Sequence, residues 1–181
     1  MNVFISGGCK NGKTGFAQET AVRLSGGGKR YYVATMQPCD DEDLARIARH
    51  IEEREGLGFE TLEQPHNVAD CLRRAEPDAT FLIDSVTALL VNEMYPDMQT
   101  GGADPKAADR CREGLLQIAA KAKNAVFVSD YIYSDAARYD AFTENYRASL
   151  ALLDRSLAET CDTVIELCAG NVIVHKGGID A

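Results

Sequence analysis

A run of eight residues near the start of the chain carries the strongest chemical signal in the sequence. It fits the phosphate-loop pattern G-x-x-x-x-G-K-[ST] and consists of Gly7, Gly8, Cys9, Lys10, Asn11, Gly12, Lys13 and Thr14. A glycine-rich turn lets backbone N–H groups converge on phosphate oxygens, and a following helix adds the positive end of its dipole. In such a loop the Lys13 ammonium reaches the β- and γ-phosphates, while the Thr14 hydroxyl binds Mg²⁺. The loop therefore predicts a site for nucleotide phosphates, although it leaves the reaction open.

Asp84 is the second candidate, because it follows a run that is typical of a buried strand. The run is Thr80–Ile83, and it predicts a carboxylate at the C-terminal edge of the sheet. Phosphate-loop enzymes often hold their metal with a carboxylate at this place. Mg²⁺ prefers oxygen ligands and keeps several waters, so Thr14 and Asp84 would suffice as its protein ligands. The alternative is that Asp84 only caps the segment after the strand.

His50 is the third candidate. The pattern predicts a helix here, on which Arg46, His50 and Arg54 share one face at spacings of i, i+4 and i+8. Neighbouring cations disfavour the protonated imidazole, and the neutral ring is the nucleophilic form. The arginines could also bind an anionic phosphate beside the ring. From these residues alone, a solvated helix face with an incidental histidine remains an open alternative.

The elements that must position these residues alternate between strand and helix. Strands are expected at about 2–6, 30–35, 59–62, 80–84 and 125–129. Helices are expected at about 15–24, 40–54 and 67–74, followed by one that ends near 123 and a long one that ends near 160. A loop is expected at 97–104, and a hairpin at 163–167 and 172–175 around a turn at 169–171. The pattern predicts a mainly parallel α/β sheet with helices on both faces and a C-terminal antiparallel hairpin.

Length and composition favour a soluble enzyme-like domain. A chain of 181 residues is expected to form one domain, 1–181, around a phosphate loop. No stretch approaches the roughly 20 apolar residues of a membrane span. No signal-peptide pattern precedes the first strand, and the six cysteines form no C-x-x-C pair, so we expect free thiols in the cytoplasm. The formal charge of −9 argues against a nucleic-acid partner.

Four motifs in order and spacing resemble one family. They are the phosphate loop, the strand Tyr32–Thr35, an R-I-x-x-H element at Arg46–His50 and an aromatic-x-Thr-x-Glu element at Phe59–Glu63. In these the chain resembles the bifunctional adenosylcobinamide kinase/adenosylcobinamide-phosphate guanylyltransferase family of cobalamin biosynthesis. The resemblance spans nearly the full length and implies a RecA-like phosphate-loop fold.

The resemblance implies a two-step reaction with GTP or ATP, Mg²⁺, and adenosylcobinamide and its phosphate as substrates. The phosphate loop, with Lys13, would serve transfer of a γ-phosphoryl group to the alcohol of adenosylcobinamide. His50 would attack the α-phosphate of GTP and carry GMP, which passes on to adenosylcobinamide phosphate. The resemblance also implies a homo-oligomer, with a trimer as one form. The residues that it places around the nucleotide are Ala34, Thr35, Met36, Ile51, Glu52, Glu53, Arg54, Glu63 and Asp84.

Three departures from the family keep alternatives open. Asp84 and Arg49 stand where relatives usually have Glu and a second His. The segment after Ser129 begins with Asp130-Tyr131, where the family usually continues with Asn-Glu-Val-Gly. One alternative is a divergent phosphate-loop kinase or paralogue that lacks one activity or acts on another alcohol. The other is a non-catalytic nucleotide-binding module; the lack of an N-K-x-D motif argues against an ordinary GTPase switch.

Overall fold

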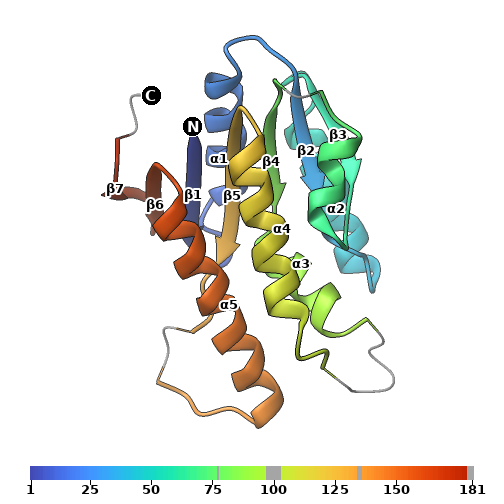
Figure 1. Cartoon of the computed structure of the whole chain (residues 1–181), viewed down its shortest axis with the longest axis vertical. Helices are drawn as coiled ribbons and strands as arrows, with labels where there is room; N and C mark the ends of the chain where they lie inside the picture. Colours follow the sequence, from blue (N-terminus) through green and yellow to red (C-terminus); the bar gives the residue numbers. More distant parts are fainter. Residues whose placement is uncertain (77, 97–102, 134–135, 179–181) are drawn as a thin grey trace.

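One twisted sheet forms the middle layer of the protein, as the computed structural model of the chain shows (Figure 1). The structure describes residues 1–76, 78–96, 103–133 and 136–178. Within these ranges the sheet has seven strands in the order β3-β2-β4-β5-β1-β6-β7. Every neighbouring pair is parallel except β6 and β7, which are antiparallel. The strands are β1 (Asn2–Gly7), β2 (Arg30–Ala34), β3 (Phe59–Glu63), β4 (Thr80–Asp84), β5 (Asn124–Asp130), β6 (Thr163–Cys168) and β7 (Asn171–Lys176).

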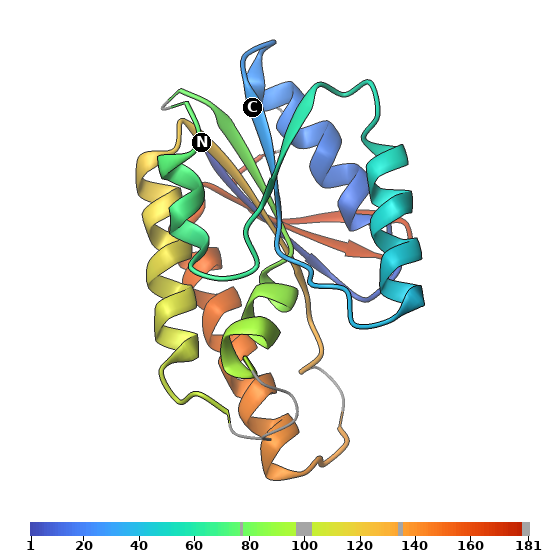
Figure 2. The ribbon, with the colours of Figure 1, turned by 90° about the vertical axis from the view of Figure 1, so that its right-hand side faces the viewer.

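Helices cover both faces of this sheet, as predicted. Figure 2 shows α1 and α2 on one side and η1, α4 and α5 on the other. Ala17 of α1 packs with Ile5 of β1 in one core cluster, and Leu115 of α4 packs with Phe127 of β5 in the other. Strands with two covered faces are apolar almost throughout, which explains their continuous hydrophobic runs. The helices are α1 (Lys13–Ser25), α2 (Asp41–Glu53), the 3₁₀ helix η1 (Val68–Arg73), α3 (Val86–Met94), α4 (Ala107–Lys121) and α5 (Ala141–Thr160).

The C-terminal hairpin is confirmed, with strands slightly longer than predicted. β6 runs to Cys168, and β7 begins at Asn171. Ala169 and Gly170 form the turn, with φ angles of 49° and 79°. Positive φ at both turn residues gives the twist that joins two antiparallel strands tightly.

Two expectations about helices were wrong. No helix was predicted between Asp84 and the loop at 97–104, yet α3 fills Val86–Met94. Its sequence is apolar and continues the run of β4, so periodicity did not reveal it; the signal was Ser85, whose hydroxyl accepts a hydrogen bond from Ala88 N. Asn67 was expected to cap a helix but takes a left-handed conformation and makes no cap with its side chain before η1. Of the predicted loop, 97–102 lie outside the described residues.

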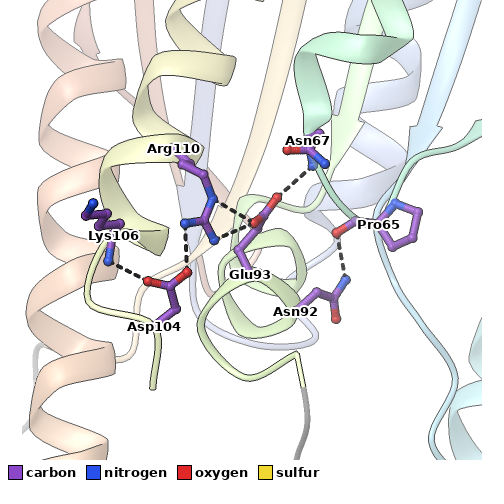
Figure 3. A network of polar contacts seen from close by, with 7 residues as sticks. All are labelled: Pro65, Asn67, Asn92, Glu93, Asp104, Lys106 and Arg110. Carbon is purple, nitrogen blue, oxygen red and sulfur yellow. Dashed lines mark hydrogen bonds and ion pairs between the residues drawn. The ribbon is translucent and has the colours of Figure 1, made fainter. Parts of the chain in front are cut away.

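A buried glutamate joins α3 to the elements around it (Figure 3). Glu93 is 6% exposed; one carboxylate oxygen accepts a hydrogen bond from Asn67 N at 2.6 Å, and the other accepts from Arg110 Nη2 of α4 at 3.0 Å. The Arg110 guanidinium also pairs with Asp104 at 2.7 Å. The neighbouring Asn92 donates to Pro65 O at 3.1 Å. These contacts fix the chain between β3 and η1, part of which lines the cavity described below.

Candidate nucleotide and transfer site

The phosphate loop lies where the predicted strand and helix place it. β1 ends at Gly7, and α1 begins at Lys13. Lys10 and Gly12 take left-handed φ angles of 58° and 79°, which turn the chain back into the helix. A Cβ atom at Gly7 would lie 2.5 Å from Leu167 O, so only glycine lets the loop start this close to β6. The first N–H groups of α1 are thereby aimed at the space above the loop, as a phosphate site needs.

Lys13 is held by two acceptors at the end of the sheet. Its side chain is 6% exposed, and Nζ lies 2.6 Å from both Gly8 O and Asp130 Oδ1. Asp130 was not among the site residues predicted from the sequence. A signal was present, since Asp130 follows a buried apolar run just as Asp84 does.

A cavity of about 1270 Å³ opens between α2 and the C-terminal ends of β2, β3 and β4. The apolar side of α2 faces it through Leu44, Ile47 and Ile51, and no residue of α2, which is described along its whole length, is buried. An amphipathic helix usually buries such a stripe against the core, so this cavity separates α2 from the sheet. Asp130 also lines the cavity and thus connects it with the phosphate loop. The predicted site residues in its lining are Ala34, Met36, His50, Ile51, Glu52, Arg54, Glu63 and Asp84.

Two predicted cavity residues do not line the cavity. The Thr35 side chain is fully buried, and its hydroxyl accepts from Ser85 N and donates to Ser85 O, both at 2.7 Å. Thr35 therefore ties the end of β2 to the end of β4. Glu53, at the end of α2, is exposed outside the cavity lining.

His50 is half-buried and faces this cavity. Burial is the largest cause that lowers the pKa of its imidazole, and the Arg46 and Arg49 charges act in the same direction. The Asp84 and Glu53 carboxylates oppose that shift of the pKa. The sequence had suggested Arg46 and Arg54 as the cause, so the direction agrees but the main reason is desolvation. His50 is thus neutral near pH 7, with a ring nitrogen free to act as a nucleophile.

Arg54 has a different role from the one expected. It caps the end of α2, and its guanidinium lies 4.2 Å from the centre of the Tyr32 ring. It also donates to Thr61 Oγ1 at 3.1 Å. Arg54 therefore joins α2 to β2 and β3 at the cavity wall through a cation–π contact and a hydrogen bond.

Asp84 lies at the base of the cavity and is hydrogen-bonded to β2. Tyr32 donates to Asp84 Oδ2 at 2.8 Å, and burial followed by the Asp84 charge raises the pKa of the tyrosine well above its usual range. Tyr32 is a second lining residue that was not predicted as part of the site.

The oxygen donors at this edge of the sheet suit Mg²⁺ better than a softer metal. No group of three or more His, Cys, Asp or Glu side chains is placed to hold a metal within the described ranges. Mg²⁺ does not need such a group, because it keeps several waters and accepts one or two protein oxygens beside substrate phosphates. The Thr14 hydroxyl and the Asp84 carboxylate fit that requirement chemically.

Comparison with known proteins gives one family and a fold. A family model described as cobinamide kinase / cobinamide phosphate guanyltransferase matches residues 3–174. No curated protein matches the chain. Among solved structures, a phage-type helicase name is not needed to state the likeness: one ATPase domain is similar with a TM-score of 0.54 and 12% identity, over 97% of this chain and 76% of that chain.

A second solved structure, the flagellar accessory protein FlaH from Methanocaldococcus jannaschii, is similar with a TM-score of 0.51 and 14% identity. The match covers 98% of this chain and 79% of that chain. At such identities these likenesses show the phosphate-loop α/β fold alone. In the described part of the chain, no helix has the length and apolar character to cross a membrane.

Proposed function

Because the chain belongs to the cobinamide kinase / cobinamide phosphate guanyltransferase family, we propose that it catalyses both reactions on adenosylcobinamide. It phosphorylates the alcohol of that substrate and then transfers GMP from GTP to the resulting phosphate through His50. One observation carries the proposal: a half-buried histidine and a phosphate loop open at the same edge of one sheet, with Asp130 touching the loop lysine and lining the histidine's cavity.

The kinase step depends on positioning and on neutralising charge. The loop N–H groups and the Lys13 ammonium bind the β- and γ-phosphates, which requires Lys13 to leave Asp130. Mg²⁺, when bound by Thr14 and Asp84, supplies further positive charge to the phosphates. The alcohol approaches from the cavity, so its hydroxyl is held in line with the γ-phosphorus.

The guanylyl step uses His50 as the nucleophile. A neutral ring nitrogen forms a bond to the α-phosphorus of GTP, and the bond from that phosphorus to the pyrophosphate oxygen breaks. An oxygen of adenosylcobinamide phosphate then attacks the same phosphorus, and the bond to His50 breaks. Arg46, on the same helix, would balance phosphate charge beside the ring. The cavity residues around the nucleotide in this proposal are Ala34, Met36, Ile51, Glu52, Arg54 and Glu63.

Two labelled forms of GTP test the proposal. With Mg²⁺ and adenosylcobinamide, label on the γ-phosphate is expected in adenosylcobinamide phosphate, and label on the α-phosphate in the final GDP-linked product. Transfer of γ-label alone would contradict the guanylyl step and leave a divergent kinase. Tight nucleotide binding with neither transfer would support a binding module instead.

A further inference from the structure

Asp130 stands at the junction of the phosphate loop and the large cavity. It ends β5, its side chain is 19% exposed, and its Oδ1 atom lies 2.6 Å from Lys13 Nζ. It also belongs to the cavity lining together with His50 and Asp84. A group that moves from one site to the other must therefore pass close to this carboxylate.

The backbone of Asp130 is fixed on both sides. It pairs in register with Gly7 at the start of the phosphate loop, and Tyr131 N donates to Gly7 O at 3.3 Å. On the other side, Asp130 N donates to Thr87 Oγ1 of α3 at 2.9 Å. The position of the carboxylate relative to the loop is thus set by the sheet and by α3, as a reacting group requires.

We propose that Asp130 is a catalytic residue of the phosphorylation step, where it binds the hydroxyl group of the alcohol and accepts its proton. This inference rests on the kinase activity proposed above. The hydroxyl oxygen forms a bond to the γ-phosphorus, while the bond from that phosphorus to the β,γ-bridging oxygen breaks. The electron pair leaves with the nucleoside diphosphate, and the proton goes to the Asp130 carboxylate. Lys13 turns to the phosphates in the same complex and so frees this carboxylate.

Asp130 suits this role better than Asp84 does. β5 lies directly beside β1, whereas β4 is one strand further from the loop. Asp84 is also hydrogen-bonded to Tyr32 on β2, at the side of the cavity where α2 lies. The partner of the Asp130 carboxylate is instead the lysine that the nucleotide recruits.

The test compares Asp130→Asn with a matched control, Asp109→Asn, on the exposed surface of α4. Asp109 is paired only loosely, at 3.5 Å from Arg112 Nη2. Initial rates of γ-phosphoryl transfer to adenosylcobinamide are measured over a range of both substrates. In parallel, each protein is incubated with GTP labelled on the α-phosphate, and the label bound to His50 is counted.

Asp130→Asn is expected to lower kcat for phosphorylation by at least about 100-fold, with KM for the nucleotide unchanged or lower. Its His50 label should match the wild type, because attack by the imidazole releases no proton from an alcohol. Asp130→Glu should recover part of kcat, and Asp109→Asn should behave as the wild type.

A kcat for Asp130→Asn within threefold of the wild-type value would overturn the inference, and so would a raised nucleotide KM with normal kcat. An equal loss of His50 labelling would also overturn it, because Asp130 would then only support the fold or Lys13. If the wild type phosphorylates no alcohol, the proposed function itself fails, and this result differs from the others.

Discussion

Lys13, Asp130 and His50 do three different things at one edge of the sheet. Lys13 supplies a positive charge on the phosphate-loop helix, and Asp130 holds that charge when no phosphate competes. His50 supplies a neutral nitrogen, because burial lowers the pKa of its ring. The residue types explain the division of labour: a fixed cation for phosphates, a carboxylate beside it, and a nucleophile that needs no activation near pH 7.

Lys13→Ala is expected to lower kcat for γ-phosphoryl transfer by roughly 100- to 1000-fold, the loss typical of one transition-state donor. The variant also leaves the Asp130 carboxylate next to the phosphates without its counter-charge. Steady-state rates with labelled nucleotide measure the effect. Lys121→Ala at the end of α4 is the control for removing a lysine. Near-normal turnover of Lys13→Ala would contradict the assignment of the loop.

At the scale of elements, α2 and α3 hold the cavity from opposite sides and in different ways. α2 carries His50 and buries none of its residues, so the contact of Arg54 with Tyr32 helps to hold its end against the sheet. α3 is apolar and buried, and Glu93 fixes it to α4 and to Asn67. The exposed helix thus carries the nucleophile, while the buried helix supports the cavity wall.

Glu93→Gln is expected to lower the free energy of unfolding by about 1–2 kcal/mol. The change removes the charge that strengthens two hydrogen bonds from Arg110, at the scale typical of hydrogen bonds to charged groups. Urea unfolding with an unchanged slope measures it. Glu113→Gln, on the exposed side of α4, is the control and should change little. Equal stability of the two variants would show that the cluster in Figure 3 contributes nothing to α3.

Asp154 on α5 gives a prediction about pH. Its side chain is buried, Tyr133 donates to Oδ2 at 2.8 Å, and burial raises the pKa of this carboxyl to about 6. The native state therefore holds a proton between about pH 4 and 6 that the unfolded chain has lost, so this group adds stability as pH falls through 6. At pH 7 the ionised, buried carboxylate costs stability.

Asp154→Asn removes that cost while it keeps an oxygen for Tyr133. We expect the variant to gain up to about 3 kcal/mol at pH 7, and little near pH 4, where the carboxyl is already protonated in the native state. Denaturant unfolding at both pH values, with Asp109→Asn as the surface control, tests this. A variant that is less stable at pH 7 than at pH 4, relative to the wild type, would contradict the sign.

For the whole molecule, the sequence was informative wherever one local pattern decided the structure. The phosphate loop, the buried strands and the hairpin follow from glycine spacing, apolar runs and turn residues, and so does the parallel sheet. The contact of Lys13 with Asp130 depends instead on β5 lying beside β1, and no local pattern states strand order. Thr35 was misplaced for a similar reason, since its partner is Ser85 on the neighbouring strand's continuation. α3 escaped because a buried helix and a buried strand look alike in short apolar runs.

The central claim is that His50 carries GMP, and covalent labelling tests it most directly. The protein is incubated with Mg²⁺ and GTP labelled on the α-phosphate, denatured, and digested to locate the label. We expect acid-labile, base-stable label on the peptide that contains His50, and none in His50→Ala. Because the pKa of His50 is lowered, the rate of labelling should stay level down to a pH below its usual value of about 6.5. Label of equal amount in His50→Ala, or no label in a wild type that binds GTP, would contradict the account.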